Sequence, residues 1–370
     1  MRKFILTCLT FGLVSCGGGG GSDAIPIKPI SIDTSSYINV KNLDFHSMSF
    51  PQQSGQALRG DAQVFFTQSQ GQVSLFLARL QYSARTHTPS LAPASTFEFY
   101  RLAADNWVQY NPKIDRQADN CLHPRKAITA DFNLDGIVDI VVACHGYDGD
   151  NYPGEFSIIL LSTGPDQYVQ RAISNSKEFY HSVSAADLNQ DGKSDLVFAL
   201  GQRGLAVYIN DGMGNFKESK DYIVGTQGTV YTVELMDVNN DSKSDLVIGG
   251  HEWETSSRLV LKQESNRFDL SSAINIVPVP GAGVVLDFVF ANSKLYILRT
   301  GDPTESIGNF YKGLYLQQFS IQDRTSQLIV SDANWQDNRY TYPANWLNWV
   351  RYYDGYIVSL WGQAIKIRII

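Results

Sequence analysis

The sequence has few charged residues and few methionines. Only 18% of its 370 residues are charged, and 30 lysines and arginines stand against 37 aspartates and glutamates, for a net charge of −7. This balance argues against a general nucleic-acid-binding protein, because such proteins neutralise phosphates with basic side chains. Hydrophobic residues make up 43% of the chain, which excludes intrinsic disorder. Four methionines against 30 glycines, with 12% aromatic residues, favour short strands and tight turns over a helical bundle.

The apolar run at the N-terminus is too short to cross a membrane. Arg2 and Lys3 precede an apolar segment over residues 4–14, whereas a bilayer requires about 20 apolar residues. The segment ends in Ser15-Cys16, followed by a run of glycines. This pattern resembles the lipobox of a bacterial lipoprotein, and the resemblance implies cleavage of residues 1–15 and lipidation of Cys16. The alternative is a plain secretory signal with a chance cysteine.

We therefore expect a lipid-anchored protein of the cell envelope. Residues 16–35 would hold the lipidated cysteine and a flexible, glycine-rich tether. Gly17 stands where an aspartate would retain a lipoprotein in the inner membrane, so the resemblance implies the outer membrane in a Gram-negative cell. The membrane partner is thus expected through the N-terminal lipid alone.

The sequence has only four cysteines, and two of them remain after these assignments. Cys8 lies in the signal peptide and Cys16 is the lipidation site. Cys121 and Cys144 are then a pair in an oxidising compartment, where disulfides persist. The sequence therefore predicts a disulfide between them, with two separate buried thiols as the alternative.

An internal repeat dominates the middle of the chain. Three segments align without gaps: ADFNLDGIVDIVVA from Ala130, ADLNQDGKSDLVFA from Ala186 and MDVNNDSKSDLVIG from Met236. An alternating run precedes each acidic motif, and an apolar strand and two further short strands follow it. Four strands in about 50 residues are typical of one blade of a β-propeller. The sequence therefore predicts an all-β propeller of four-stranded blades.

Degenerate copies extend the array in both directions. Segments from Asp61, Val284 and Trp349 bring the count to six blade cores, and the chain length leaves room for seven. The last segment has only three strands, so we expect a strand within residues 37–50 to complete it and close the ring. In the copy from Val284, Asp287 takes the first acidic position, but Leu295 occupies the ninth. Residues 36–370 are thus expected to form a single propeller domain.

The acidic motif reads D-x-N-x-D-[GS]-x-x-D. Side-chain oxygens at positions 1, 3, 5 and 9, with the main-chain carbonyl of position 7, are the ligands that Ca²⁺ requires. An EF-hand is excluded, because position 12 holds Val142, Phe198 or Ile248 and the flanks are strands. Asx turns without metal are the alternative. The predicted calcium ligands are Asp131, Asn133, Asp135, Ile137 and Asp139; Asp187, Asn189, Asp191, Lys193 and Asp195; and Asp237, Asn239, Asp241, Lys243 and Asp245.

These motifs, together with NDGMGNF at 210–216, resemble the FG-GAP or VCBS repeats of integrin α-chain propellers and bacterial surface proteins. The resemblance covers residues 125–272. It implies a propeller with calcium in the turn between the first two strands of a blade. The family includes adhesive receptors, lectins and a few polysaccharide-degrading enzymes, so the resemblance does not select one function.

A ligand is expected on the face opposite these turns. In an antiparallel blade the second strand runs away from the metal turn, so the loops that follow the second strands cluster on the other face. Their aromatic rings, imidazoles and carboxylates suit a glycan or protein ligand. A solvated loop face without a ligand is the alternative. The candidate ligand-binding residues are His145, Tyr147, Asp148, Tyr152, Arg203, His251, Glu252 and Trp253.

The sequence lacks catalytic motifs. HEWE at 251–254 is not the H-E-x-x-H zinc motif, because Thr255 stands where the second histidine would be, and no G-x-S-x-G, Walker or dinucleotide-binding pattern occurs. We therefore assign no catalytic residue and expect a binding or adhesion module. The alternatives are a scaffold of an envelope assembly and a polysaccharide lyase or hydrolase that uses His145 or His251 as a base.

Overall fold

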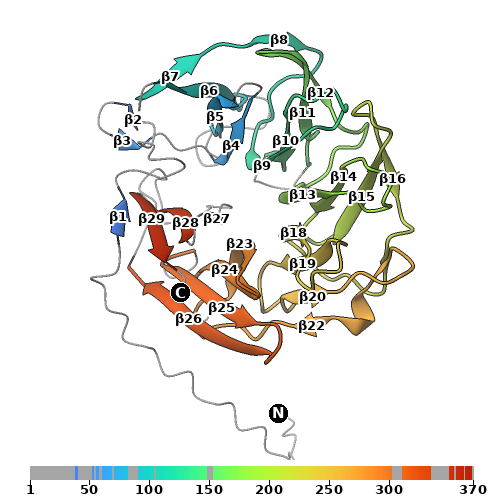
Figure 1. Ribbon diagram of the computed structural model, residues 1–370, viewed down its shortest axis with the longest axis vertical. Helices are drawn as coiled ribbons and strands as arrows, with labels where there is room; N and C mark the ends of the chain where they lie inside the picture. The colour runs from blue at the N-terminus through green and yellow to red at the C-terminus, as the bar shows by residue number, and fades with distance from the viewer. Residues whose placement is uncertain are drawn as a thin grey trace, which may run out of the picture.

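The sheets of the protein form a ring around a central axis (Figure 1). The computed structural model describes residues 38–40, 52–53, 56–57, 61–68, 71–81, 91–103, 106–147, 153–301, 311–334, 350–353, 356–361 and 363–368. Within these ranges, no helix is long and apolar enough to cross a membrane. The ring of antiparallel sheets confirms the predicted all-β propeller.

Five blades are built from contiguous chain, and in each the first strand lies nearest the axis (Figure 1). Blade 1 holds β4 (Ala62–Thr67), β5 (Val73–Arg79), β6 (Thr96–Ala103) and β7 (Asn106–Tyr110). Blade 2 holds β9 (Pro124–Ala130), β10 (Asp139–Cys144), β11 (Ile158–Gly164) and β12 (Gln167–Ala172), and β8 (Lys113–Arg116) pairs with β12 in parallel. Blade 3 holds β13 (Ser182–Ala186), β14 (Asp195–Ala199), β15 (Leu205–Asn210) and β16 (Phe216–Ser219). Blade 4 holds β18 (Thr232–Met236), β19 (Asp245–Gly249), β20 (Arg258–Val260) and β22 (Ile274–Asn275). Blade 5 holds β23 (Val284–Ala291), β24 (Lys294–Thr300), β25 (Leu314–Ser320) and β26 (Thr325–Asp332).

Two pairs of short strands lie outside these sheets. The pairs are β2 (Gln52–Gln53) with β3 (Gln56–Ala57), and β17 (Ile223–Val224) with β21 (Phe268–Asp269), which the single-turn helix η3 (Leu270–Ser272) follows. The central strands β10, β14 and β19 are buried along their whole length. They read as continuous apolar runs because neighbouring blades cover both faces of each sheet.

A sixth sheet of the ring, with four strands, joins the two ends of the described chain. It consists of β27 (Val350–Tyr353), β28 (Tyr356–Trp361), β29 (Gln363–Arg368) and β1 (Ile38–Val40). Strand β1 pairs antiparallel with β29, with Ile38 opposite Lys366. A strand within 37–50 therefore completes the last sheet, as predicted. Of the six predicted blade cores, five are blades of contiguous chain and the sixth is this composite sheet.

The prediction for Asp287 is wrong. The sequence placed it at the start of a degenerate metal turn, but it lies within β23, opposite Leu298 of β24. The hairpin turn of blade 5 falls five residues later, at Asn292 and Ser293, which both have positive φ. Such a pair is typical of a tight two-residue hairpin turn. The strands of blade 5 are longer than those of blades 3 and 4, so the same spacing in sequence no longer marks the turn.

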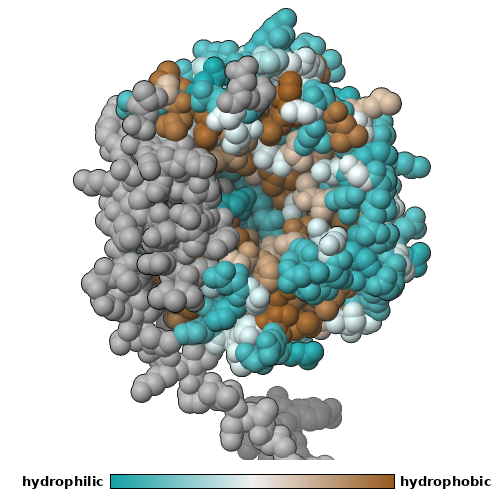
Figure 2. Space-filling view, in the orientation of Figure 1, coloured by the Kyte–Doolittle hydropathy of each residue, from teal (hydrophilic) through white to brown (hydrophobic). Residues whose placement is uncertain are grey.

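Asp287 instead belongs to a central charge network, which comprises Lys126, Glu234, Asp287 and Arg351. These residues lie on the innermost strands β9, β18, β23 and β27. The Lys126 ammonium pairs with the carboxylates of Glu234 and Asp287, the latter at 3.0 Å. Arg351 pairs with the other oxygen of Asp287 at 3.1 Å. The network therefore ties the composite sheet to blades 2, 4 and 5. The centre of the ring is hollowed on the face seen in Figure 2, and hydrophilic side chains lie in the hollow.

Cys121 and Cys144 form a disulfide in the structure, with their Cα atoms 5.8 Å apart. Cys144 ends β10 opposite Pro124, after a bulge in the β9–β10 pairing. Cys121 lies three residues before Pro124, just before the start of β9. The bridge therefore joins the segment before the first strand of blade 2 to the end of its second strand.

Replacing both cysteines with serine is expected to lower the free energy of unfolding by about 3 kcal/mol, because the cross-link restricts the unfolded chain. Urea unfolding of the oxidised wild type and of the double variant measures this difference. If both thiols of the denatured, non-reduced protein react with an alkylating reagent, the disulfide is absent and the prediction is wrong.

Candidate functional site

Three acidic loops follow the innermost strands of blades 2, 3 and 4. We call residues 131–139, 187–195 and 237–245 loops 1, 2 and 3. In loop 1, the Asp131 carboxylate accepts hydrogen bonds from the main-chain N–H of Asp135 and Gly136 at 3.1 and 2.8 Å. The Asn133 Oδ1 accepts from Asp135 N–H, and Asp135 Oδ1 accepts from Ile137 N–H. Loops 2 and 3 repeat each of these contacts.

The sixth position of each loop needs the left-handed backbone conformation. Gly136 and Gly192 have φ of +80° and +83°, and Ser242 in loop 3 has φ of +66°. Glycine adopts this conformation without steric cost, whereas a residue with a Cβ is strained by about 1 kcal/mol or more. Loop 3 therefore keeps the geometry of the other two at a cost in stability.

The aspartate at the ninth position of each loop is buried, whereas the residues at the tip of the loop are exposed. Asp139, Asp195 and Asp245 are fully buried. One oxygen of each carboxylate accepts a hydrogen bond from the main-chain N–H of the second loop residue, which is Phe132, Leu188 or Val238. The other oxygen accepts from the main-chain N–H of a residue at or just after the end of the third strand, which is Ser162, Asn210 or Lys262. Burial raises the pKa of Asp139 and of Asp195 to about 6. These carboxylates therefore tie each loop to its own blade, and each oxygen keeps a second lone pair.

The donor set of every loop is oxygen alone: carboxylates, an asparagine amide oxygen and main-chain carbonyls. Hard cations with six to eight ligands, above all Ca²⁺, prefer such donors. The residues present therefore fit the ion that the sequence predicts. Thiolates and imidazoles, which softer metals prefer, do not occur in the three loops.

A chain of aromatic rings in contact, most of them tilted or edge-on to their neighbours, lies at the opposite ends of the same inner strands. We call it the histidine arc: His123, His145, Phe179, His181, Tyr231, His251 and Trp253. Neighbouring ring centroids are 3.9 Å apart for His123–His145, 5.0 Å for His145–His181, 4.6 Å for His181–Tyr231 and 4.4 Å for Tyr231–His251. Phe179 contacts both His145 and His181. The arc therefore crosses blades 2, 3 and 4.

Strand direction explains why the arc and the loops lie apart. His123, His181 and Tyr231 come just before β9, β13 and β18, whereas loops 1–3 come just after those strands. His145 and His251 follow β10 and β19, which run back from the loops. Both groups of rings therefore meet at the end of each blade that is remote from its acidic loop.

A carboxylate and the disulfide hold the first pair of the arc in place. Glu155 accepts hydrogen bonds from the main-chain N–H of Leu122, His123 and Gly146. The Cys121–Cys144 bridge joins the same two segments. The imidazoles of His123 and His145 are thus fixed from both sides of their contact.

The three buried imidazoles of the arc are neutral. Burial lowers the pKa of His123, His145 and His181 well below the ordinary value of 6.5, and the positive charge of Arg125 lowers each further. His145 Nδ1 lies 3.0 Å from the carbonyl oxygen of Gly146. Neutral imidazoles can each donate and accept one hydrogen bond.

The structure places the predicted ligand residues in different settings. His145 and Tyr147 are buried, His251 is half-buried, and Trp253 is 45% exposed and stacked on His251 with centroids 4.5 Å apart. Arg203 pairs with Glu178, and its side chain is 67% exposed. Asp148 and Tyr152 lie outside the described residues. Of the candidates, the structure therefore brings His145, His251 and Trp253 into one arc.

Glu252, also a predicted ligand-binding residue, has its carboxylate engaged with other side chains of the protein. Its side chain is largely buried, accepts hydrogen bonds from Ser257 and pairs with the buried Arg299 at 2.8 Å. Sequence reasoning missed His123, His181 and Tyr231, which come before inner strands rather than after second strands. The missed signal was that an antiparallel blade brings the start of its first strand and the end of its second strand together.

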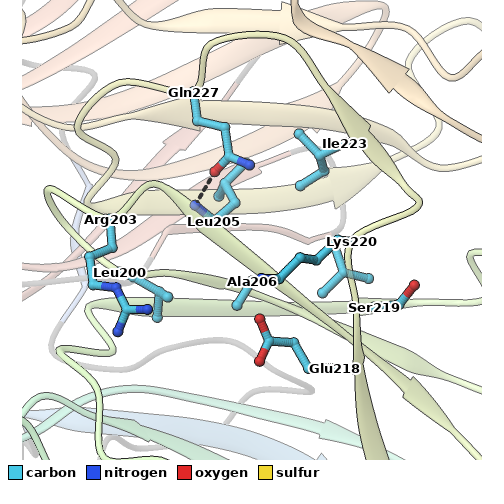
Figure 3. A pocket seen from close by; sticks show the side chains of 10 residues that line it. Leu200, Arg203, Leu205, Ala206, Glu218, Ser219, Lys220, Ile223 and Gln227 are labelled. Carbon is cyan, nitrogen blue, oxygen red and sulfur yellow. Dashed lines mark hydrogen bonds between the residues drawn. The ribbon is translucent and has the colours of Figure 1, made fainter.

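A shallow cavity of about 260 Å³ lies on blade 3, apart from the rings of the arc. Figure 3 shows Arg203, Glu218 and Lys220 around it, over Leu200 and Ala206. The side-chain oxygen of Gln227 accepts a hydrogen bond from Leu205 N–H at its edge. Of the predicted ligand residues, this cavity includes Arg203.

The arc should make stability depend on pH. The folded pKa values of its histidines lie below 6.5, so the unfolded state binds more protons and the free energy of unfolding falls as the pH drops below 6.5. Asp139 and Asp195, with pKa values raised to about 6, act in the opposite sense as the pH falls through 6. A variant isolates the histidine effect. For each pH unit below 6.5, the free energy of unfolding of His181→Phe should rise by about 1.4 kcal/mol relative to that of the wild type.

Urea unfolding at about pH 7 and about pH 5 tests this relative gain. Tyr180→Phe is the matched control, because the neighbouring Tyr180 has a pKa raised by burial far above this range, and its stability difference should not change with pH. A difference for His181→Phe that is equally constant would contradict the neutral arc.

Comparisons with known proteins point to the repeat. The family model described as FG-GAP-like repeat matches residues 131–198 and 187–248. Phosphatidylinositol-glycan-specific phospholipase D of Bos taurus is 29% identical over 150 residues, covering 33% of this chain and only 18% of that protein. An exo-β-1,3-galactanase from Phanerochaete chrysosporium aligns with a TM-score of 0.46 at 12% identity, covering 76% of this chain and 65% of its own. The Aleuria aurantia lectin aligns at 0.43 and 8%, covering 75% and 81%. These two structural likenesses carry no argument about function. The chain is a β-propeller that contains FG-GAP-like repeats over residues 131–248.

Proposed function

We propose that this protein is a lipid-anchored, calcium-binding β-propeller of the cell envelope that binds a glycan or protein ligand. One observation carries the proposal: the acidic loops lie at one end of the inner strands of blades 2–4, and the histidine arc lies at the other. In the proposed function, this arrangement would separate a metal-binding end from a ligand-binding end.

Calcium would have a structural role in this function. Asp131, Asn133 and Asp135 of loop 1, and the same positions of loops 2 and 3, would hold the ion with the carbonyl of position 7 and the ninth-position carboxylate. A bound divalent ion neutralises carboxylates that otherwise repel each other. The chain's own part is to hold these oxygens in place through the main-chain hydrogen bonds of each loop.

The ligand would contact the arc. Trp253 offers an exposed aromatic surface, stacked on His251. His251 Nε2 in turn lies 3.0 Å from the Tyr311 hydroxyl. Aromatic faces with a few fixed polar groups are typical of sites for carbohydrates and peptides.

The test is binding of the mature protein to a glycan array in the presence and absence of calcium. Trp253→Ala should lower binding at least tenfold without lowering the melting temperature, because the side chain is exposed. Met213→Ala is the control, since Met213 is 70% exposed and lies in the β15–β16 turn beside loop 1. A Trp253→Ala variant that binds as the wild type does would place the ligand elsewhere.

The proposed membrane anchor rests on Cys16, which lies outside the described residues. Cys16→Ala should abolish incorporation of labelled palmitate and leave the signal peptide uncleaved, because the thiol is the proposed acceptor of the lipid. Metabolic labelling followed by mass spectrometry of the N-terminus checks both outcomes. Labelling that persists in the variant would exclude lipidation at this residue.

A further inference from the structure

The three acidic loops differ in the basic side chains around them. In loop 2, the Lys193 ammonium lies 3.0 Å from a carboxylate oxygen of Asp191. In loop 3, the equivalent Lys243 pairs instead with Glu264, an exposed residue outside the loop. In loop 1 the equivalent residue is Ile137, and among the described residues no basic side chain pairs with a carboxylate of this loop.

Each of loops 1 and 2 also receives a side chain from the next blade. Asn210 of blade 3 donates its amide N–H to the carbonyl oxygen of Phe132, the second residue of loop 1. Lys262 of blade 4 donates its ammonium N–H to the carbonyl oxygen of Leu188, the second residue of loop 2. Lys262 is buried, so its charge stays beside loop 2. Loop 2 therefore has two cations in contact with it, and loop 1 has a neutral amide.

Loop 1 has an additional oxygen. The Ser162 hydroxyl lies 3.1 and 2.9 Å from the two carboxylate oxygens of Asp135. The main chain of Ser162 also binds the loop, since its N–H donates to Asp139 and its carbonyl accepts from the Asn133 amide. The equivalent residues Asn210 and Lys262 direct their side chains to the preceding blade. A hydroxyl oxygen is a suitable ligand for a hard cation.

We propose that the three loops bind calcium with graded affinity, loop 1 most tightly and loop 2 most weakly, and that Ser162 supplies an additional oxygen to loop 1. This inference rests on the proposed calcium binding. The physical reason is charge: each loop has three carboxylates, but Lys193 and Lys262 offset two of them in loop 2. A unit positive charge about 6 Å from a divalent ion in water lowers its affinity by about tenfold.

Isothermal titration of the mature chain with calcium tests the order. Variants with two loops disabled isolate the third: Asp191→Ala with Asp241→Ala leaves loop 1, Asp135→Ala with Asp241→Ala leaves loop 2, and Asp135→Ala with Asp191→Ala leaves loop 3. We expect the dissociation constant to be lowest for loop 1 and highest for loop 2. Thermal melting of each variant shows that it is folded before titration.

Two further substitutions test the cause. Lys193→Gln should tighten loop 2 by about tenfold, and Ser162→Ala should weaken loop 1 and leave loops 2 and 3 unchanged. Lys177→Gln is the matched control: this exposed lysine lies in the segment before β13 of blade 3, at the end of that strand remote from the loops. It removes the same charge and should change no dissociation constant by more than about twofold.

The outcomes separate the inference from the function on which it rests. Three equal dissociation constants, or no change of loop 2 in Lys193→Gln, would overturn the graded order while calcium binding stands. Unchanged loop 1 affinity in Ser162→Ala would remove Ser162 from the site. No calcium binding at millimolar concentration in the wild type would overturn the proposed function itself.

Discussion

Replacing Asp287 with alanine is expected to lower the free energy of unfolding by about 3–5 kcal/mol, because it breaks a buried ion-pair network and leaves charges uncompensated. Asp287 is fully buried. One of its oxygens binds Lys126, and the other accepts hydrogen bonds from Arg351 and from Val350 N–H. Burial alone raises the pKa of Asp287, but Lys126 and Arg351 hold it below the usual value. The carboxylate is therefore ionised, and its loss deprives the Lys126 and Arg351 cations of a shared carboxylate partner.

The Asp287→Ala substitution should weaken contacts among several sheets of the ring. Lys126 is on β9 of blade 2, Glu234 on β18 of blade 4, and Val350 and Arg351 are on β27 of the composite sheet. Urea unfolding measures the loss. Glu264→Ala is the control, since Glu264 is 97% exposed in its pair with Lys243 and should change stability by less than about 1 kcal/mol. An Asp287→Ala variant as stable as this control would show that the network contributes nothing.

Removing calcium is expected to lower the melting temperature sharply. Binding to the folded state alone stabilises by about 2.7 kcal/mol per site at a hundredfold excess of ligand over the dissociation constant. Asp135→Ala, Asp191→Ala and Asp241→Ala should each remove part of this dependence, because each deletes the fifth-position carboxylate of one loop. If the loops are graded as proposed, Asp135→Ala removes the largest part at low calcium.

Scanning calorimetry with calcium and with a chelator measures the shift. Asp287→Ala is the internal control: it lowers the melting temperature in both conditions and should keep the full calcium shift, because Asp287 lies outside the loops. If the melting temperature is the same with and without chelator, the three motifs are Asx turns that do not bind calcium.

Local patterns identified the repeated blades and their acidic turns. The spacing of Asp131, Asp187 and Asp237 and the apolar strands after them predicted the hairpins of blades 2–4, because strand alternation and turn chemistry are encoded within a few residues. The family match over residues 131–248 covers the same region. Blades 1 and 5 and the composite sheet lack the complete acidic motif, so only their patterns of apolar strand residues indicated them in the sequence.

The sequence predicted only part of the histidine arc. His145 and His251 were found because they follow second strands, but His123, His181 and Tyr231 belong to other segments. Their neighbourhood depends on the pairing of β9 with β10 and on the packing of blade 2 against blade 3. Burial then decided their chemistry, since the same histidines in exposed loops would have ordinary pKa values.

The sequence by itself determined the blade repeat, the composition of each acidic loop, the cysteine pair and the need for a strand from the N-terminal part to complete the last sheet, because each depends on residues close together in the chain or on a simple count. Only the tertiary structure decided the partners of Asp287, the burial of Glu252 and the contact of Lys262 with loop 2. These contacts join residues 161, 47 and 74 positions apart. The packing of blades around the ring brings such residues together. Neither strand periodicity nor turn chemistry predicts which side chains will then be in contact.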